Sequence, residues 1–253
     1  MEPVYKKVGI GNPESMTQLE FKLLSVRSGE THTVRQPTQE AVVVILSGAC
    51  SVKVDRQAFM LKRKNVIDEL ASAVYIPLGT SYVISGDQDA ELAICLCSAT
   101  AKKSAVFISS VQVKKKRVGR ENFERYVYDI VDSSIDTQHL IVGETLNPPG
   151  NWSSFPPHKH DTEIPDREVK MEEIYYFKVS PPEGFGFQRL YTSNGDLDKA
   201  IVIKDDMVVN IPYGYHPVCS MPGYWIYYLW FLAGQNRILR PNTDPTFKWL
   251  ETS

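Results

Sequence analysis

The chain has 253 residues, of which 43% are hydrophobic and 23% charged, which suffices for one large buried core or two smaller ones. A formal net charge of −2 gives no support for a nucleic-acid partner or an anionic membrane surface. No apolar run is long enough to span a membrane, and the first residues lack the apolar segment of a signal peptide. The four cysteines form no CxxC pair, so we expect free thiols in a cytoplasmic protein.

Short strands dominate the predicted elements. Runs rich in valine, isoleucine, tyrosine and phenylalanine are separated by glycine, proline, asparagine and aspartate, which is typical of an all-β sandwich or barrel. In chain order, the predicted strands are 41–46, 74–76, 92–97, 127–131, 174–179, 200–203, 208–211 and 225–232. No long segment has a helical period. The sequence therefore predicts an all-β fold.

Segments about half a chain apart resemble each other. The sequence IPLGTS at 76–81 resembles IPYGYH at 211–216, and EAVVVILSG at 40–48 resembles the segment from 172 to 179. Two similar β-domains in tandem explain this repeat. We place them at 1–115 and 116–253, because the basic run Lys114–Arg117 is best interpreted as a solvated loop at the junction.

The second half carries a pattern of metal ligands. His158 and His160 are separated by one residue, so on a strand they point to the same face. Glu172 or Glu173 follows at the start of a predicted strand, and His216 comes after a Pro-x-Gly turn. Three neutral imidazoles and one carboxylate suit a single divalent metal, with zinc the first choice and manganese, iron or nickel the alternatives.

The first half lacks such a ligand set. It has Ser81 where the second half has His216, and His32 stands alone before its first apolar strand. We interpret His32 and His139 as structural residues. The first domain is therefore expected to support the fold or an interface rather than to carry catalysis.

The order HxH, Glu, glycine turn and final His resembles the metal pattern of the cupin superfamily of jelly-roll β-barrels. The resemblance implies two tandem cupin domains, a bicupin, of which the first is degenerate and the second binds the metal. Eleven residues separate His160 from Glu172, where cupins usually have three or four, and we interpret the polar insert 161–170 as a loop over the mouth of the site.

Three glutamates compete for the carboxylate position. Glu163 fits the usual cupin spacing better, but no strand follows it. Glu172 is preferred because it stands three residues before Tyr175 on a strand, and Glu173 has the same spacing to Tyr176. The choice between Glu172 and Glu173 stays open.

A longer set of motifs narrows the resemblance. They are NWSS at 151–154, PPHKHD at 156–161, EEIYYF at 172–177, GFGFQR at 184–189, YGYHPV at 213–218 and PGY at 222–224. Together they resemble the 5-deoxy-glucuronate isomerases of inositol catabolism and the related isomerases of 4-deoxy-5-keto-uronic acids. The resemblance covers 145–250 well and the first half loosely. It implies an isomerase that converts an open-chain sugar acid, 5-deoxy-glucuronate, into the ketose 5-dehydro-2-deoxy-gluconate.

Such a reaction needs a charge stabiliser, a proton carrier and an anchor for the substrate carboxylate. A divalent metal would stabilise the enediolate charge, while a general base moves a proton between C2 and C1. The candidate catalytic residues are Asp161, Glu173, Tyr175 and Tyr191. Arg189, with its neighbour Gln188, is the candidate for substrate binding, because a guanidinium grips a carboxylate with two hydrogen bonds. Strand alternation turns Lys159 away from the metal.

Other functions remain possible for the same ligand set. A metal-dependent dioxygenase and an isomerase of a related uronic acid would use the same four ligands. A sugar-sensing regulator usually carries a DNA-binding helix-turn-helix, which this sequence does not predict. The expected partner is a small sugar acid, and exposed edge strands favour a homo-oligomer.

Overall fold

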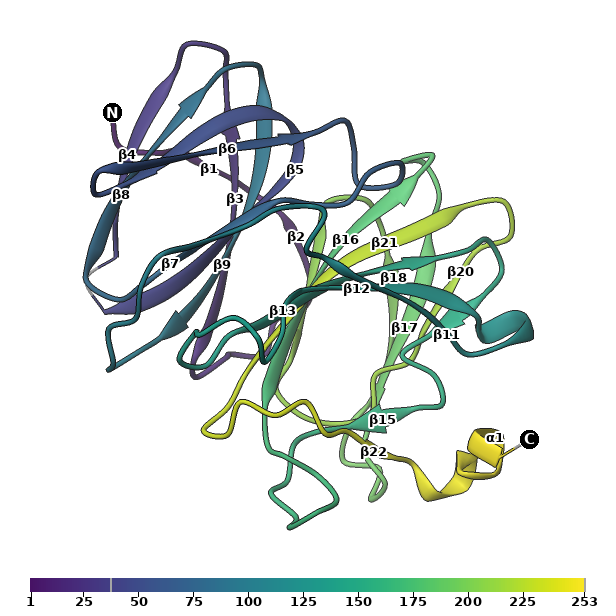
Figure 1. Ribbon diagram of the computed structural model, residues 1–253. Helices are drawn as coiled ribbons and strands as arrows, with labels where there is room; N and C mark the ends of the chain where they lie inside the picture. Colours follow the sequence, from purple (N-terminus) through teal and green to yellow (C-terminus); the bar gives the residue numbers. More distant parts are fainter. Residues whose placement is uncertain (37, 253) are drawn as a thin grey trace. The chain divides into compact units, whose positions relative to one another are not determined.

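The computed structural model describes residues 1–36 and 38–252 and consists almost entirely of β-strands (Figure 1). Its helical elements are short: η1 (Glu121–Phe123), η2 (Pro245–Phe247) and α1 (Trp249–Thr252). The prediction of an all-β fold is confirmed, and each predicted strand lies within an observed one. Within these described ranges, no helix has the length and apolar character needed to cross a membrane.

The chain folds into two compact units, each assembled from several segments. Unit 1 contains residues 1–8, 18–114 and 129–142, and unit 2 contains residues 9–17, 115–128 and the chain from 143 onward. The predicted domains, 1–115 and 116–253, are consecutive stretches. The structure instead places segment 9–17 in unit 2 and segment 129–142 in unit 1.

Unit 1 is built around one long strand. β5 (Gln39–Val54) takes part in both the sheet order β1-β3-β9-β5-β7-β10 and the set β6-β5-β8-β4. The other strands are β1 (Tyr5–Lys6), β3 (Leu19–Val26), β4 (Thr31–Gln36), β6 (Gln57–Arg63), β7 (Ala73–Ile76), β8 (Thr80–Gly86), β9 (Ala90–Ser98) and β10 (Val106–Ile108).

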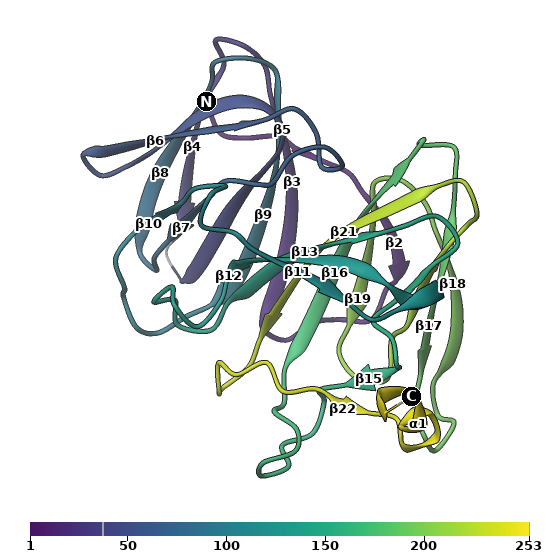
Figure 2. The same ribbon diagram turned by 45° about the vertical axis from the view of Figure 1, so that its right-hand side comes forward.

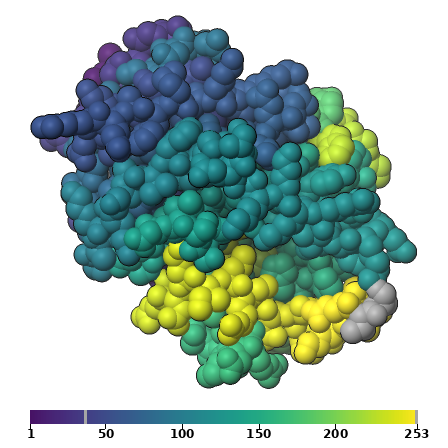
Figure 3. All heavy atoms as spheres, in the orientation of Figure 1, coloured from purple at the N-terminus to yellow at the C-terminus, as the bar shows by residue number. Residues whose placement is uncertain are grey.

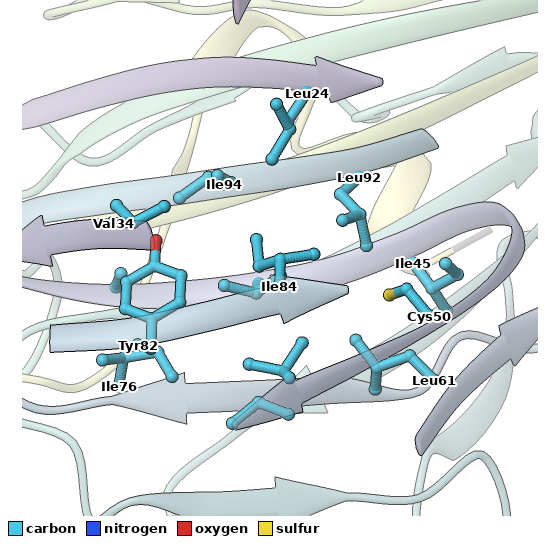
Figure 4. Packing of buried hydrophobic residues seen from close by; sticks show 14 of the residues in the cluster. Leu24, Val34, Ile45, Cys50, Leu61, Ile76, Tyr82, Ile84, Leu92 and Ile94 are labelled. Atoms are coloured by element: carbon cyan, nitrogen blue, oxygen red, sulfur yellow. The ribbon is translucent and has the colours of Figure 1, made fainter. Parts of the chain in front are cut away.

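Apolar side chains fill the interior of unit 1. Figure 4 shows members of this cluster, among them Ile76, Tyr82, Ile84 and Leu92, gathered from several strands of the unit. All four are almost completely buried. Such packing stabilises the unit by burial of apolar surface.

Unit 2 has one large sheet and two smaller ones. The large sheet has the order β11-β12-β13-β21-β16-β19-β2, the second has the order β14-β20-β17-β18, and β15 pairs with β22. These strands are β2 (Gly9–Asn12), β11 (Lys114–Val118), β12 (Arg125–Val131), β13 (Ile141–Asn147), β14 (Trp152–Ser153), β15 (His158–Lys159), β16 (Glu172–Ser180), β17 (Gly186–Tyr191), β18 (Asp198–Ile203), β19 (Met207–Ile211), β20 (Val218–Ser220), β21 (Trp225–Ala233) and β22 (Asn242–Thr243). β2 runs parallel to β19, so the N-terminal segment completes this sheet.

The two units share a strand order. The path β3-β9-β5-β7 of unit 1 matches β13-β21-β16-β19 of unit 2, and β6-β5-β8-β4 matches β18-β17-β20-β14. The sequence repeat follows this match, because Ile76 ends β7 as Ile211 ends β19. Opposite Ile76 stands Ala41, whereas opposite Ile211 stands Glu173. Unit 1 therefore carries a methyl group where unit 2 carries a carboxylate.

Candidate metal centre

A short strand presents the first two histidines. β15 pairs with β22, which fixes the extended backbone from His158 toward His160, and both views of the ribbon show these two strands side by side (Figures 1 and 2). The C-terminal segment that carries β22 is coloured yellow and reaches the surface beside green atoms of unit 2 (Figure 3). Strand alternation turns Lys159 to the other face, where its Nζ lies 2.8 Å from a carboxylate oxygen of the fully buried Glu168.

A glycine turn delivers the third histidine. Gly214 has φ of +93°, and a Cβ there would lie 2.8 Å from a backbone oxygen of Tyr191, so the turn needs glycine. The Gly214 amide donates a hydrogen bond of 2.8 Å to Asp161. His216 follows and is fully buried. Asp161 therefore links the loop after His160 to the turn before His216.

The structure brings Glu173, rather than Glu172, to the histidines. One carboxylate oxygen of Glu173 lies 3.1 Å from Nε2 of His160 and 3.2 Å from Nε2 of His216. The ligand atoms of these three buried residues all lie within 4.8 Å of one another. The preference for Glu172 therefore does not fit the geometry.

Glu172 has a different task. Alternation along β16 points it to the opposite face, where its carboxylate accepts hydrogen bonds from the backbone amide of Thr17, at 3.0 and 3.1 Å, and from the Thr17 hydroxyl. This contact ties the N-terminal segment of unit 2 to the first residue of β16. Each of the two glutamates stands three residues before a tyrosine, so that spacing could not identify the metal ligand.

Backbone carbonyls orient all three imidazoles in the same way. Nδ1 of His158 lies 3.2 Å from the Pro156 oxygen, that of His160 lies 3.1 Å from the Met171 oxygen, and that of His216 lies 3.0 Å from the Gly214 oxygen. Each Nδ1–H thus donates to a carbonyl, which leaves the Nε2 lone pair as the free ligand. The rings of His158 and His216 also meet edge to face, with centroids 5.0 Å apart.

The electrostatics of the cluster favour a neutral imidazole at His158 and an ionised carboxylate at Glu173. Burial and the neighbouring His216 and His160 lower the pKa of His158 to about 3. Burial alone would raise the pKa of Glu173, but the adjacent His160 and His216 side chains outweigh it and lower that pKa to about 2. An ionised carboxylate and a neutral imidazole are the forms that bind a metal.

The donor set fits one divalent cation. Nε2 of His216 is buried and close to Glu173, yet it makes no hydrogen bond with any described residue. A buried polar atom without a partner is costly, and a metal ion would satisfy it. Imidazole nitrogens with one carboxylate suit zinc and its first-row neighbours.

Aromatic residues line one side of the cluster. The ring of Tyr175 meets the His216 ring edge to face at 5.8 Å and stacks on Tyr228 at 4.6 Å. The Tyr175 hydroxyl lies 2.8 Å from the Ser154 hydroxyl. Burial and the charge of Glu173 raise the pKa of Tyr175 well above its ordinary value, so it stays protonated. Tyr175 is the predicted tyrosine that the structure places at the cluster.

Gln188 and Arg189 point in opposite directions from β17. Gln188 is fully buried, and its amide donates to the backbone oxygen of His216 at 3.3 Å, which leaves its own oxygen without a partner among the described residues. Arg189 is exposed and makes two hydrogen bonds of 2.8 Å to Asp198. The predicted anchor Arg189 is therefore engaged on the outer face, away from Gln188.

Tyr191 and Asp161 are held by other partners. The Tyr191 hydroxyl donates to Asp244 at 2.7 Å, and its ring stacks on Tyr215 at 5.0 Å. Asp161 pairs with Lys159 at 2.5 Å in addition to holding the Gly214 amide. Both stabilise the surroundings of the cluster, and neither lies in the group formed by the ligand atoms.

Sequence reasoning missed Glu168. Its buried carboxylate accepts hydrogen bonds from the amides of Asp161 and Thr162, from Lys159 and from Asn242. It therefore organises the 161–170 insert from within. The sequence offered one signal, a charged residue directly before the apolar Val169, which is weak evidence for a buried carboxylate.

The fold and the cluster define an all-β protein with a buried His/Glu site suited to one divalent metal. A model of the KduI/IolB family matches residues 7–250, and the chain belongs to this family. It is 36% identical over 236 residues to a 5-deoxy-glucuronate isomerase of Geobacillus kaustophilus (strain HTA426), an alignment that covers 92% of this chain and 86% of that protein.

Two solved structures extend the comparison. An IolB-like protein from Salmonella typhimurium LT2 has a TM-score of 0.91 and 30% identity, over 99% of this chain and 98% of that chain. The oxalate decarboxylase of Lactobacillus farciminis has a TM-score of 0.66 with 13% identity, over 93% and 81% of the two chains. The second likeness concerns the fold alone.

Proposed function

We propose that this chain is an aldose–ketose isomerase that converts 5-deoxy-glucuronate into 5-dehydro-2-deoxy-gluconate in inositol catabolism. The similarity to curated 5-deoxy-glucuronate isomerases along nearly the whole chain supports this activity. The observation that carries the proposal is the buried cluster of His160, Glu173 and His216. The four free thiols support a location in the reducing cytoplasm.

In this proposal, His158, His160, Glu173 and His216 hold one divalent metal, and zinc is the first choice. When bound, such a metal supplies Lewis-acid stabilisation of the negative charge that develops on two adjacent substrate oxygens. The carbonyl oxygens that fix each Nδ1 hold the imidazoles in the ligand orientation. Preorganised ligands need not reorient when charge develops in the transition state.

In this proposal, two further side chains contact the substrate. Tyr175 stays protonated beside His216, so its hydroxyl donates a hydrogen bond to a substrate oxygen. The unpartnered oxygen of Gln188 accepts a hydrogen bond from a substrate hydroxyl. The stacked rings of Tyr175 and Tyr228 exclude water from this side of the cluster, which strengthens its electrostatic interactions.

A proton NMR time course tests the proposal. The purified, metal-loaded protein is mixed with 5-deoxy-glucuronate in deuterated water. We expect loss of the aldehyde-hydrate and C2 signals and growth of the keto-acid product. An unchanged spectrum, from protein shown to hold about one metal ion per chain, contradicts the proposed reaction, and consumption of oxygen under the same conditions indicates an oxygenase.

A further inference from the structure

One buried cation of unit 2 has no counter-ion. Arg125 opens β12 and is 91% buried, since its relative exposure is 9%. Its one hydrogen bond among the described residues runs from Nη1 to the backbone oxygen of Phe123, at 3.1 Å. No described carboxylate lies within ion-pair distance of it. Arg117 and Arg189, by contrast, are exposed and paired with carboxylates.

A buried guanidinium without a carboxylate is costly to keep. Burial lowers the pKa of Arg125, whereas the nearby Tyr228 and Tyr175 raise it. Arginine nevertheless remains charged in proteins, so the desolvation of this cation is not relieved by loss of a proton. Replacement of a buried charged group by an apolar residue of similar volume is often neutral or stabilising. A cation kept in such a place is suited to binding an anion.

The same two tyrosines connect Arg125 to the metal-ligand cluster. Tyr228 and Tyr175 both lie near enough to the guanidinium to affect its pKa. Tyr228 stacks on Tyr175, and Tyr175 meets the His216 ring. Arg125 and the cluster therefore both lie near the same pair of aromatic rings, all within unit 2.

A glycine turn holds the guanidinium in place. Gly119 has φ of +80°, and a Cβ there would lie 2.9 Å from Nη1 of Arg125 and 2.3 Å from the Phe123 oxygen. The turn packs directly against the side chain, so the planar fork is restrained before any ligand arrives. Restraint of this kind reduces the entropy lost on binding.

We propose that Arg125 binds the carboxylate of the sugar-acid substrate, while the carbonyl end of the same molecule lies at the His/Glu cluster. The guanidinium can donate two parallel N–H hydrogen bonds to a carboxylate. The Phe123 oxygen accepts only one hydrogen bond from it and carries no negative charge. The inference rests on the proposed isomerase activity for the identity of the acid. It assigns to Arg125 the part that the sequence suggested for Arg189.

Binding of a non-reacting acid tests this subsite independently of turnover. Calorimetry compares glucuronate with glucose on the metal-loaded wild type, on Arg125→Gln and on the matched control Arg117→Gln, which removes an exposed arginine. We expect Arg125→Gln to weaken glucuronate binding by about 10- to 100-fold, the range for a hydrogen bond to a charged group. Glucose binding, metal content and the behaviour of Arg117→Gln should stay as in the wild type.

Stability separates a binding role from a structural one. Because Arg125 makes a single hydrogen bond and has no carboxylate partner among the described residues, Arg125→Gln should keep or raise the melting temperature, whereas an arginine held by several hydrogen bonds would lower it when replaced. Arg125→Lys keeps the charge without the fork, so it should fall between the wild type and Arg125→Gln. Folding of both variants is checked by metal content and near-UV circular dichroism.

The possible outcomes distinguish the two proposals. Equal glucuronate affinity in wild type and Arg125→Gln overturns the subsite, as does a loss of affinity in Arg189→Gln that Arg125→Gln does not share. A KM for 5-deoxy-glucuronate that rises with unchanged metal content in Arg125→Gln supports it. Arg125-dependent glucuronate binding in a protein that fails to turn over 5-deoxy-glucuronate supports the subsite and contradicts the isomerase activity.

Discussion

Adjacent glutamates on β16 allow the metal assignment to be tested by one substitution at two positions. Glu173→Gln removes the charge that faces His160 and His216, and Glu172→Gln removes the charge that faces Thr17. The two variants have the same chemistry, the same strand and opposite faces. Any difference between them therefore reports the face and not the substitution.

We expect Glu173→Gln to weaken metal binding and Glu172→Gln to lower only the stability of the fold. Replacing residues that merely orient a metal ligand reduces affinity about 10- to 100-fold, so loss of the ligand charge of Glu173 should cost at least about 100-fold. A 100-fold loss removes about 2.7 kcal/mol of metal-linked stabilisation when the metal is in excess. For Glu172→Gln we expect a cost of about 1 kcal/mol from weaker hydrogen bonds to Thr17, or roughly 2–4 °C in melting temperature.

Melting with and without a chelator separates these effects. Wild type and Glu172→Gln should gain the same increase in melting temperature from metal, and both should retain about one ion per chain by elemental analysis. Glu173→Gln should lose most of that increase. If Glu173→Gln keeps its metal while Glu172→Gln loses it, the face assignment on β16 is wrong.

Three further predictions concern other parts of the chain. Arg63→Ala should destabilise unit 1 by about 3–5 kcal/mol in urea unfolding, because the buried guanidinium donates to several backbone carbonyls; a cost below about 1 kcal/mol contradicts this. Gly29→Ala should lower the free energy of unfolding by about 1–2 kcal/mol, because Gly29 has a positive φ. Gly48→Ala should lower it further, because Gly48 also has a positive φ and its added Cβ would lie 1.9 Å from a backbone oxygen. Equal melting temperatures of the two variants would argue against the clash. His216→Ala should abolish metal binding and activity with intact β-sheet circular dichroism, whereas Ser81→Ala, on the exposed surface of unit 1, should leave both unchanged.

The sequence predicted the strands because their signal is local. Runs of β-branched and aromatic residues between turn residues identify each strand without reference to its partners. The HxH spacing placed His158 and His160 on one face by the same local rule. The glycine turn before His216 is likewise a local pattern, and the positive φ of Gly214 explains its composition.

What the sequence could not supply depends on contacts between distant segments. Whether Glu172 or Glu173 faces the histidines depends on which side of β16 is covered by β15 and by the turn at Gly214. Arg189 faces outward because Asp198 lies on the paired strand β18. The isolated Arg125 carries no motif, and its burial depends on the Gly119 turn and on tyrosines from two other strands.

The N-terminal strand is the clearest case of a long-range contact. β2 pairs with β19 in parallel, and Asn12 donates to the backbone oxygen of Asn210, 198 residues away. A short parallel strand pair has no hairpin turn from which the sequence could predict it. For this reason a division into consecutive halves was the natural prediction, although the chain assembles each unit from separated segments.

The shared strand order of the two units explains why one can hold a polar site and the other cannot. Unit 1 fills its interior with apolar side chains, and its Glu40 carboxylate is used to bind Tyr75 and the backbone amides of residues 138–140. Unit 2 instead buries Nε2 of His216 and the side-chain oxygen of Gln188 without hydrogen-bond partners among the described residues, and the Arg125 guanidinium with a single hydrogen bond. Such groups lower the stability of a unit unless a ligand satisfies them. The same framework therefore serves stability in unit 1 and binding in unit 2, because Ala41 and Ser81 replace the ligand positions in the first copy.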